Sequence, residues 1–315
     1  MADNQGKRPE MTFEKLMEFN TGNSDKITRR YLDQLLIEMR IIDSDLASTE
    51  AEIFGTKLAT PIMLGAIAGY EFMGENAILR EAEAAGELNT IMWLNEHMTD
   101  DEIKAVVGSG AKAAMVVKPY RDLNMFLDLA KKFTDLGCIA IASDIDHAYS
   151  RRDGGYDHSM QGVEFGPRSS DELRTIVFTL EVPFVAKGVL SVHDAVCCDN
   201  AGVKHIIVSH HHNIMDYSVP PLMILPDIKK AVSGDMTVIV DCGIDTGADA
   251  FKALALGADL VCTARAVMKT LRSDGKDGVV KLIRDNTAQL RNFLNRTGSP
   301  DISHIDPSVI HHLEF

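Results

Sequence analysis

The 315-residue chain lacks the features that mark membrane, secreted and multidomain proteins. No apolar run approaches the roughly 20 residues that a membrane-spanning helix needs. The opening segment, MADNQGKRPE, is polar and has no apolar stretch of the kind found in signal peptides. No repeat, low-complexity block or linker separates a second domain. We therefore expect a cytoplasmic protein with no membrane partner and one large domain.

Cysteine and positive charge are scarce as well. The five cysteines form no C-x-x-C pair, and most lie within apolar segments. This distribution predicts buried, reduced thiols, as is usual in the cytosol. Lys and Arg number 32 against 46 Asp and Glu, which gives a formal net charge of −14. Because binding to nucleic acid depends on basic residues that contact phosphates, we expect no nucleic-acid partner.

What the sequence does contain, from residue 61 onward, is an alternation of apolar runs with helical patterns. Runs rich in aliphatic and β-branched residues are typical of strands buried in a parallel sheet. Eight of them begin at Pro61, Thr90, Ala113, Cys138, Pro183, His205, Thr237 and Leu260. Thr99, Ser169 and Ser191 each precede a helical pattern and have an acidic residue three places on, which favours a helix start. Eight such units predict an α/β fold, a (β/α)8 TIM barrel of about 250 residues.

This prediction divides the chain into three parts. Residues 1–60 would form an N-terminal helical extension packed on the barrel, with the helical pattern in residues 11–50. Residues 61–305 would form the barrel, and the pattern in residues 277–298 predicts its last outer helix. Residues 306–315 would be a solvated C-terminal tail.

Titratable residues follow three of the predicted strands directly. The fifth strand ends in Lys187-Gly188, the sixth in the run from Ser209 to His212, and the seventh in Asp241. Barrel enzymes place their chemistry at the carboxyl ends of the strands. The cluster therefore predicts an active site at this end of the barrel.

The loops after the seventh and eighth strands are the usual phosphate site of a barrel. Gly243 and Gly247 leave backbone N–H groups accessible where a helix opens at Ala248, and Arg265 adds a fixed positive charge. Tight turns alone would also explain these glycines. The pairing of both loops at this spacing favours a cofactor that carries a phosphate.

In order and spacing these motifs resemble the FMN-dependent 2-hydroxy acid oxidase and dehydrogenase family, which includes glycolate oxidase, lactate oxidase and mandelate dehydrogenase. The matching segments are Lys187-Gly188, Ser209-His210-His211, Asp241 to Gly247, the run KALALGA that follows, and Ala264-Arg265. The resemblance implies FMN as cofactor, a small-molecule substrate, and oxidation of a 2-hydroxy acid or related alcohol to the oxo product. It also implies a homo-oligomer, a tetramer by family precedent.

The resemblance assigns roles to individual residues. His211 aligns with the catalytic histidine, which takes the substrate proton while hydride passes to the flavin. Asp146 aligns with an aspartate that would orient this base. Lys187, the third catalytic residue, would stabilise the reduced flavin ring. Cofactor contacts are expected from Ala66, Ile67, Ala68, Val116, Asp144, Lys187, Ser209, Asp241, Gly243, Asp245, Ala264 and Arg265.

The expected substrate site departs from the family pattern. Ile214 takes the place of the arginine that clamps the substrate carboxylate. Lys118 replaces a substrate tyrosine, and Val116 replaces an amide that contacts the flavin. Arg152 matches a basic position after the fourth strand and is expected, with Lys118, to bind a carboxylate instead.

Further departures concern charge and size. Asp245 stands where the family carries an arginine near the phosphate, and it would weaken anion binding if it pointed inward. Asp144 replaces a threonine and adds a second carboxylate near Asp146, which would raise the pKa of one of them. Trp93, Ile214 and Met215 together favour a larger, more apolar substrate.

Other interpretations stay open at this point. His210, His211 and His212 could simply end a buried strand. We expect no metal, because consecutive strand residues alternate faces and at most two of three histidines could converge. The barrel could also use FMN with an altered substrate or for non-redox isomerase chemistry. It could equally be a catalytically degenerate remnant that binds a phosphorylated ligand.

Overall fold

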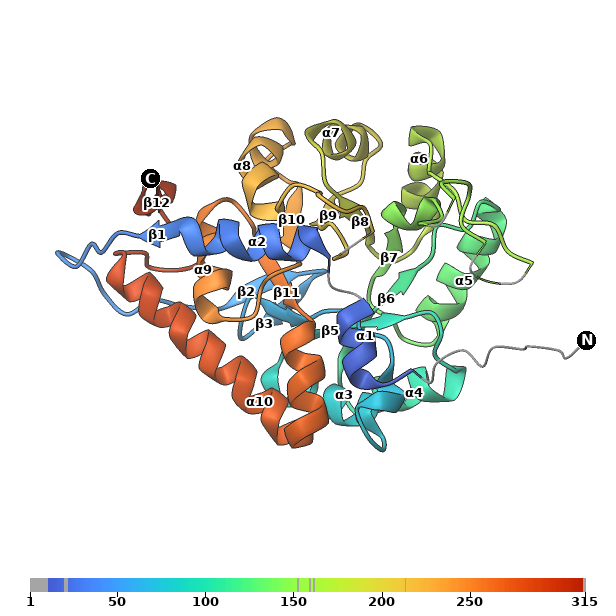
Figure 1. Ribbon diagram of the computed structural model, residues 1–315, viewed down its shortest axis with the longest axis horizontal. Coiled ribbons are helices and arrows are strands. Elements are labelled where there is room, and N and C mark those ends of the chain that lie inside the picture. Colours follow the sequence, from blue (N-terminus) through green and yellow to red (C-terminus); the bar gives the residue numbers. More distant parts are fainter. Residues whose placement is uncertain are drawn as a thin grey trace, which may run out of the picture.

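The computed structural model describes residues 11–19, 22–151, 153–158, 160, 162–212 and 214–313. Eight parallel strands close into a barrel in the order β10-β11-β4-β5-β6-β7-β8-β9 (Figure 1). They are β4 (Ile62–Leu64), β5 (Ile91–Asn95), β6 (Lys112–Val117), β7 (Ile141–Asp144), β8 (Phe184–Val189), β9 (His205–Val208), β10 (Thr237–Val240) and β11 (Leu260–Thr263). Each strand overlaps one of the eight predicted runs, with ends that differ by one or two residues in β5, β6, β7 and β8, so the TIM-barrel prediction is confirmed.

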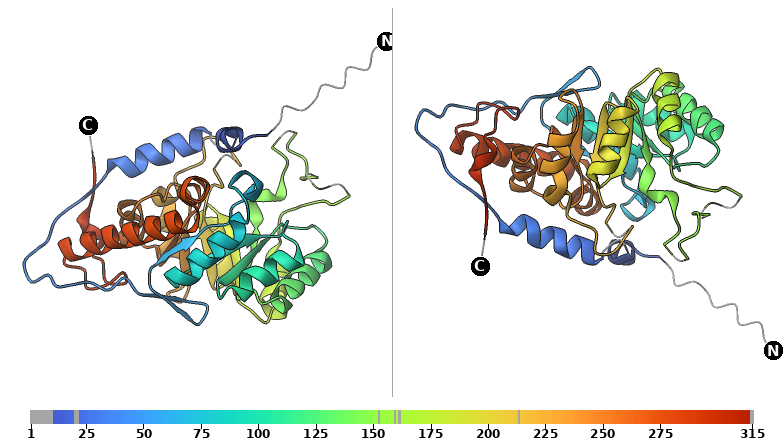
Figure 2. Two further views of the ribbon diagram at one scale, coloured as in Figure 1. Left: turned by 90° about the horizontal axis from the view of Figure 1, so that it is seen from below. Right: turned by 90° about the horizontal axis from the view of Figure 1, so that it is seen from above.

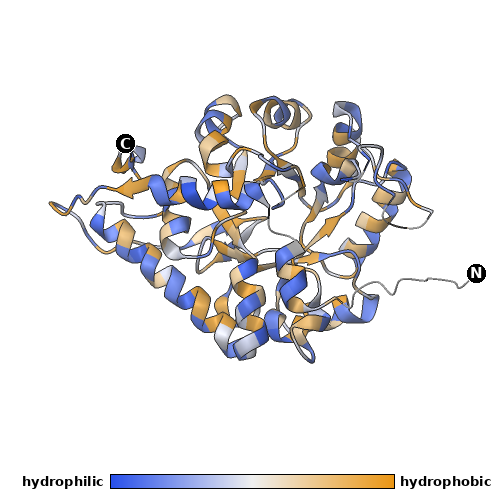
Figure 3. Ribbon diagram, in the orientation of Figure 1, coloured by the Kyte–Doolittle hydropathy of each residue, from blue (hydrophilic) through white to orange (hydrophobic). Residues whose placement is uncertain are grey.

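Helices on the outside of the barrel connect successive strands, and the last of them follows β11. They are α3 (Ala77–Leu88), α4 (Asp100–Gly108), α5 (Leu123–Asp135), α6 (Ser170–Thr179), α7 (Val192–Asn200), α8 (Pro221–Ala231), α9 (Gly247–Ala255) and α10 (Arg265–Arg296). Thr99, Ser169 and Ser191 cap α4, α6 and α7 as predicted, each accepting a backbone N–H from three residues on. Helix α10 begins earlier than residue 277 because it continues through a kink at Gly275, where φ is 62°. Figure 3 shows apolar residues concentrated on the strands and hydrophilic ones on the outer helices.

The N-terminal extension is helical only in its first half. Helices α1 (Phe13–Phe19) and α2 (Asn23–Gln34) are followed by the short strands β1 (Leu35–Ile37), β2 (Ala51–Ile53) and β3 (Thr56–Leu58). The prediction of helix up to residue 50 was therefore wrong. Strand β1 pairs antiparallel with β12 (Ile310–His312), so its hydrogen-bond partner lies at the other end of the chain, where no local pattern reveals it. The predicted tail accordingly contains a strand, although His311 and His312 remain exposed.

The hairpin of β2 and β3 closes the amino end of the barrel. The ring of Phe54 packs edge-on against His205, the first residue of β9, with 4.9 Å between the ring centroids. Ile53 and Leu58 join the apolar side chains inside the barrel, including that of Trp93. This apolar packing leaves the opposite, carboxyl end of the strands for polar groups.

Helix α2 crosses that opposite end of the barrel (Figure 2), and contacts of its side chains with the loops there support this placement. Thr28 Oγ1 lies 2.8 Å from His210 Nε2, and a Cβ on Gly243 would come within 2.9 Å of Leu32. Among the described residues, no helix has the length and apolarity needed to cross a membrane.

Candidate active site

Two adjoining cavities lie at the carboxyl end of the barrel. The larger, about 500 Å³, extends from α2 to the loops after β10 and β11 and includes Lys187. The smaller, about 220 Å³, is lined by the apolar residues Leu16, Met17, Ile67, Ile214 and Met268, with Lys118, His147 and Arg151 among its polar groups. Both cavities are bounded by Ala66, His211, His212, Ala264 and Arg265. His211 therefore lies where the two cavities meet.

The loop between β10 and α9 requires its glycines. Gly243 has φ of 85°, a left-handed conformation that glycine adopts without strain. Gly247 opens α9, and a Cβ there would lie 2.2 Å from the carbonyl oxygen of Asn286. Thr246 caps α9 by accepting the N–H of Asp249. These residues hold the N-terminus of α9 against α10 and set the shape of the larger cavity.

Basic side chains gather in the larger cavity. Lys26, Arg29, Arg30 and Arg265 line it. Asp25 opposes them: its carboxylate lies 3.0 Å from Arg265 Nη2 and 2.9 Å from His212 Nδ1. Burial acts to raise the pKa of Asp25, but the hydrogen bond from His212 and the charge of Arg265 outweigh it, so that the pKa is lowered. Asp25 is thus an anionic partner for the arginine that we expect to bind phosphate.

Asp245 also lines the larger cavity, the position in which its carboxylate would weaken the binding of an anion. Burial, together with the neighbouring charge of Asp249, raises the pKa of Asp245, because both disfavour its charged form. The cavity volume lies within the roughly 300 to 1,000 Å³ that is usual for cofactor sites. With four basic residues at the helix-opening end and the Lys187 ammonium at the barrel mouth, its donor set fits a flavin mononucleotide.

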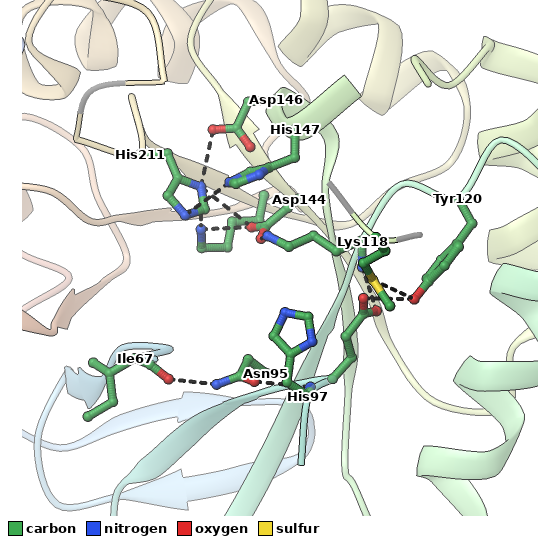
Figure 4. Close-up of polar contacts among 12 residues, drawn as sticks. Ile67, Asn95, His97, Lys118, Tyr120, Asp144, Asp146, His147 and His211 are labelled. Carbon is green, nitrogen blue, oxygen red and sulfur yellow. Dashed lines mark hydrogen bonds and ion pairs between the residues drawn. The ribbon is translucent and has the colours of Figure 1, made fainter. Parts of the chain in front are cut away.

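A charged network lies in the barrel mouth (Figure 4), and its lysines line the cavities, Lys187 the larger and Lys118 the smaller. Asp144 and Lys187 are register partners on β7 and β8, so their side chains point the same way. Lys187 Nζ donates to Asp144 Oδ1 at 2.8 Å, and Lys118 Nζ donates to Asp144 Oδ2 at 2.7 Å. Burial disfavours the Asp144 carboxylate, but the two ammonium groups hold its pKa well below the usual value. Burial likewise opposes the charge of Lys187, yet Asp144 and Asp241 raise its pKa.

His211 is positioned by its backbone and by carboxylates. Its φ is 47°, and its N–H donates to Ser209 Oγ at 3.0 Å. Its Nδ1 lies 3.3 Å from Asp146 Oδ2 and 3.7 Å from Asp144 Oδ1. The structure therefore brings together the predicted base and its predicted carboxylate partner.

Gly188 makes this arrangement possible. Its φ is 91°, and the register between β8 and β9 shifts at this residue. A Cβ at Gly188 would lie only 2.4 Å from the carboxyl carbon of Asp146. The Lys-Gly pair thus serves two purposes, because the lysine binds Asp144 while the glycine leaves room for Asp146.

The three consecutive histidines have different partners. His210 contacts Thr28 and His212 contacts Asp25, both on α2, while His211 faces the barrel network. They do not converge on one point, and each is held by a polar contact rather than simply ending a strand.

Other predicted residues fall in several places. Ile67, Ala68 and Ile214 line the smaller cavity, and Asp241 lines the larger. Val116 and Trp93 belong to the apolar packing inside the barrel and line neither cavity, and Met215 is 61% exposed. Arg152 lies outside the described residues. The roles given to these residues stay predictions.

The sequence analysis did not single out His147. It lies in a 3-10 turn, η2 (Ile145–Ala148), beside Asp146, and its Nε2 lies 3.3 Å from His211 Nε2. Burial, aided by the positive charges of His211 and Lys118, lowers the pKa of His147 to about 3. Its position directly after a predicted catalytic aspartate was the available clue.

Glu96 was missed as well. This residue follows β5, and it accepts the Lys118 N–H and the Tyr120 hydroxyl, each at 2.8 Å. Burial raises the pKa of Glu96. These bonds fix the chain on either side of Pro119 and so help to place Lys118.

Asp144, His147 and His211 also offer three metal-ligand atoms within 4.8 Å of one another. Both oxygens of Asp144 already accept hydrogen bonds from ammonium groups, which repel a cation. We assign no metal to this cluster.

Comparison with known proteins is consistent with this geometry. The model of the FMN-dependent dehydrogenase family matches residues 18–162 and 165–312. The chain therefore belongs to that family, and it is an FMN-dependent oxidoreductase built on a TIM barrel.

Among its relatives is a 4-hydroxymandelate oxidase from Amycolatopsis orientalis, 31% identical over 87% of this chain and 86% of the relative. A crystal structure of mandelate oxidase matches with a TM-score of 0.84 and 26% identity, covering 95% of this chain and 94% of that one. A mandelate oxidase variant with (S)-mandelic acid matches with a TM-score of 0.82 and 27% identity, covering 94% and 92%.

Proposed function

We propose that the protein oxidises a 2-hydroxy acid with an apolar substituent to the corresponding 2-oxo acid. The observation that carries this proposal is the position of His211, at the junction of a cavity that fits FMN and a smaller, largely apolar one. The chemistry requires a proton acceptor at such a junction, since the hydroxyl proton and the α-hydrogen leave the substrate toward different groups. FMN supplies the acceptor of the electron pair when it is bound.

Each group of residues has a proposed task. Arg265, with Lys26, Arg29 and Arg30, binds the phosphate of the cofactor, because these side chains line the basic end of the larger cavity. Lys187 carries a positive charge in the barrel mouth, where it stabilises negative charge that develops on the flavin ring. Asp146 holds the His211 ring and stabilises it once protonated.

The smaller cavity supports an apolar substituent on the substrate. With Ile214 in its wall, it lacks the carboxylate-clamping arginine expected there. Besides Arg265, which bounds both cavities, Lys118 and Arg151 line it, and we propose that these two bind the substrate carboxylate, with Arg152 as a further candidate. The mandelate oxidases among the similar proteins act on a substrate of this type, as their names state.

The test is anaerobic reduction of the flavin. Purified protein should release FMN on denaturation, and (S)-mandelate or another 2-hydroxy acid should bleach its visible absorption. His211→Gln should slow this bleaching by about 10² to 10⁴, the usual contribution of a general base, without loss of FMN. His193→Gln is the matched control, since the His193 side chain is 83% exposed on α7. A colourless protein that takes up no FMN would contradict the proposal and favour the ligand-binding remnant.

We also propose a cytoplasmic homo-oligomer, a tetramer by family precedent. All five cysteines are unpaired in the structure, as befits a reducing compartment. Light scattering after size-exclusion chromatography measures the assembly directly, and a monomer at micromolar concentration would contradict the proposal.

A further inference from the structure

We propose that His147, and not His211, first receives the substrate's hydroxyl proton, and that a two-histidine relay delivers the charge to His211. This inference rests on the proposed function, and it deepens it by assigning a second catalytic histidine. It starts from one contact, the 3.3 Å between Nε2 of His147 and Nε2 of His211 (Figure 4).

Two ring nitrogens at this distance share one hydrogen, so one ring donates and the other accepts. The position of Asp146 determines which of the two rings is the donor. Both of its carboxylate oxygens are buried and have no hydrogen-bond partner, and His211 Nδ1 lies 3.3 Å from one of them. A carboxylate accepts but does not donate, so His211 carries its hydrogen on Nδ1. Nε2 of neutral His211 is then bare and accepts, which makes His147 Nε2 the donor.

Lys187 does not reverse this assignment. Its Nζ lies 3.3 Å from His211 Nδ1 and donates a shorter bond, 2.8 Å, to Asp144, so the comparison is between this one ammonium group and the carboxylates that face Nδ1. Nδ1 also lies 3.7 Å from Asp144 Oδ1, so two carboxylates act on it against one ammonium group. A hydrogen on Nδ1 satisfies the electrostatics of the whole cluster.

The consequence concerns the substrate. His211 Nε2, the nitrogen that would take the proton directly, is already engaged by His147. His147 lines the smaller cavity. Of its two ring nitrogens, Nε2 carries the hydrogen, whereas Nδ1 carries none and has no hydrogen bond to any described residue. A substrate hydroxyl in this cavity therefore meets His147 Nδ1 before it meets a free nitrogen of His211.

The transfer balances. The hydroxyl proton bonds to His147 Nδ1 while the hydrogen on His147 Nε2 passes to His211 Nε2. His147 ends neutral in its other tautomer, and His211 ends as an imidazolium next to Asp146 and Asp144. FMN, when bound, would supply the acceptor for the α-hydrogen and its electron pair, which would leave the 2-oxo acid as the product.

The electrostatic setting suits a relay rather than a resting charge on His147. Lys118, directly after β6, faces His147, as does His211 in the loop after β9 once it is protonated, and Arg151 lines the same cavity. Asp144 and Asp146 only partly offset them, so His147 has a depressed pKa and does not keep a proton. His211, in contact with both carboxylates, is the place where the positive charge is stabilised.

The first test needs no turnover. Nitrogen-15 NMR of the histidine rings in FMN-loaded protein at neutral pH should show the hydrogen of His147 on Nε2 and that of His211 on Nδ1. Assignment uses His147→Gln and His211→Gln. A His147 ring with its hydrogen on Nδ1, or a His211 ring with its hydrogen on Nε2, would overturn the relay.

The second test is rapid-mixing reduction of the flavin by a saturating 2-hydroxy acid. His147→Phe keeps a planar ring but no nitrogen, whereas His147→Gln keeps a donor to His211 but cannot transfer a proton. Both should slow reduction at least tenfold with little change in substrate Kd. His97→Phe, an exposed histidine near the same strand ends, should leave the rate unchanged.

The outcomes are distinct. Full activity in His147→Gln would show that His147 only positions His211. Full activity in His147→Phe would show that His147 has no role in flavin reduction. Either result would overturn the relay. If no 2-hydroxy acid reduces the wild-type flavin, the proposed function fails instead, while the NMR measurement still decides the hydrogen-bond assignment.

Discussion

The amino end of the barrel and its carboxyl end bury different kinds of side chain. At the amino end, Ile53 and Leu58 of the β2–β3 hairpin pack with apolar residues of the strands. At the carboxyl end, Asp144, Lys187, Ser209 and His210 are all no more than 6% exposed. Apolar burial lowers the free energy of the folded state, whereas burial of charge raises it unless partners compensate. One end thus stabilises the fold, and the other uses part of that stability to hold reactive groups in place.

The largest expected effect on stability comes from breaking the amino end. Leu58 is 1% exposed, and Leu58→Ala should lower the free energy of unfolding by about 2 to 5 kcal/mol, because it leaves a cavity. The flavin reduction rate of the folded fraction should stay within twofold of wild type. Urea unfolding and rapid-mixing kinetics measure the two quantities. Leu46→Ala is the control, since Leu46 is 83% exposed and should change stability by less than about 0.5 kcal/mol.

A substitution at the carboxyl end should have the opposite result, with a large effect on the rate of flavin reduction and a small effect on stability. In Gly188→Ala the new methyl group would displace Asp146, and we expect flavin reduction to slow by about 10², at the lower limit of general-base effects. Gly110→Ala is a matched control, because Gly110 has nearly the same φ, 88° against 91°, but nothing within 4 Å of the added Cβ. Both variants should lose about 1 to 2 kcal/mol of stability from backbone strain. Equal rates in the two variants would contradict the role of Asp146.

The smallest expected effect compares two half-buried histidines, His205 at the amino end of the barrel and His147 at the carboxyl end. Burial lowers the pKa of His205, at the amino end, to about 4. The unfolded chain therefore binds more protons below its ordinary pKa of about 6.5, and the free energy of unfolding falls as the pH drops from 6.5 toward 4. His205→Leu should remove about 1 kcal/mol of the stability loss between pH 7 and pH 5, after allowance for solvent screening. Flavin reduction should not change.

Urea unfolding at the two pH values checks this. Identical pH dependence in wild type and variant would show that His205 is protonated as easily in the folded protein as in the unfolded chain. His147→Gln should relieve acid sensitivity in the same direction, because the pKa of His147 is also lowered, but at the expense of activity. The two variants thus distinguish a loss of stability that comes from packing alone, at His205, from one that accompanies catalysis, at His147.

The barrel was predictable because its determinants are local. Each strand is a short apolar run, and Thr99, Ser169 and Ser191 mark helix starts by hydrogen bonds that span three residues. The pairing of β1 with β12 was not predictable, since it joins residues at opposite ends of the chain. Lys187 and Asp146 were found through motifs at strand ends, where parallel topology brings residues together whatever the intervening loops.

By itself, the sequence determined the order of strands and helices, the family, and the identity of the groups at the strand ends. These follow from side-chain periodicity and from motif spacing, which a linear chain carries directly. Only the tertiary structure decided that Asp25 pairs with Arg265, that both lysines bind Asp144, and that His147 reaches His211. Those contacts depend on directions and distances between elements far apart in the chain, and they set the charges and hydrogen positions on which the chemistry rests.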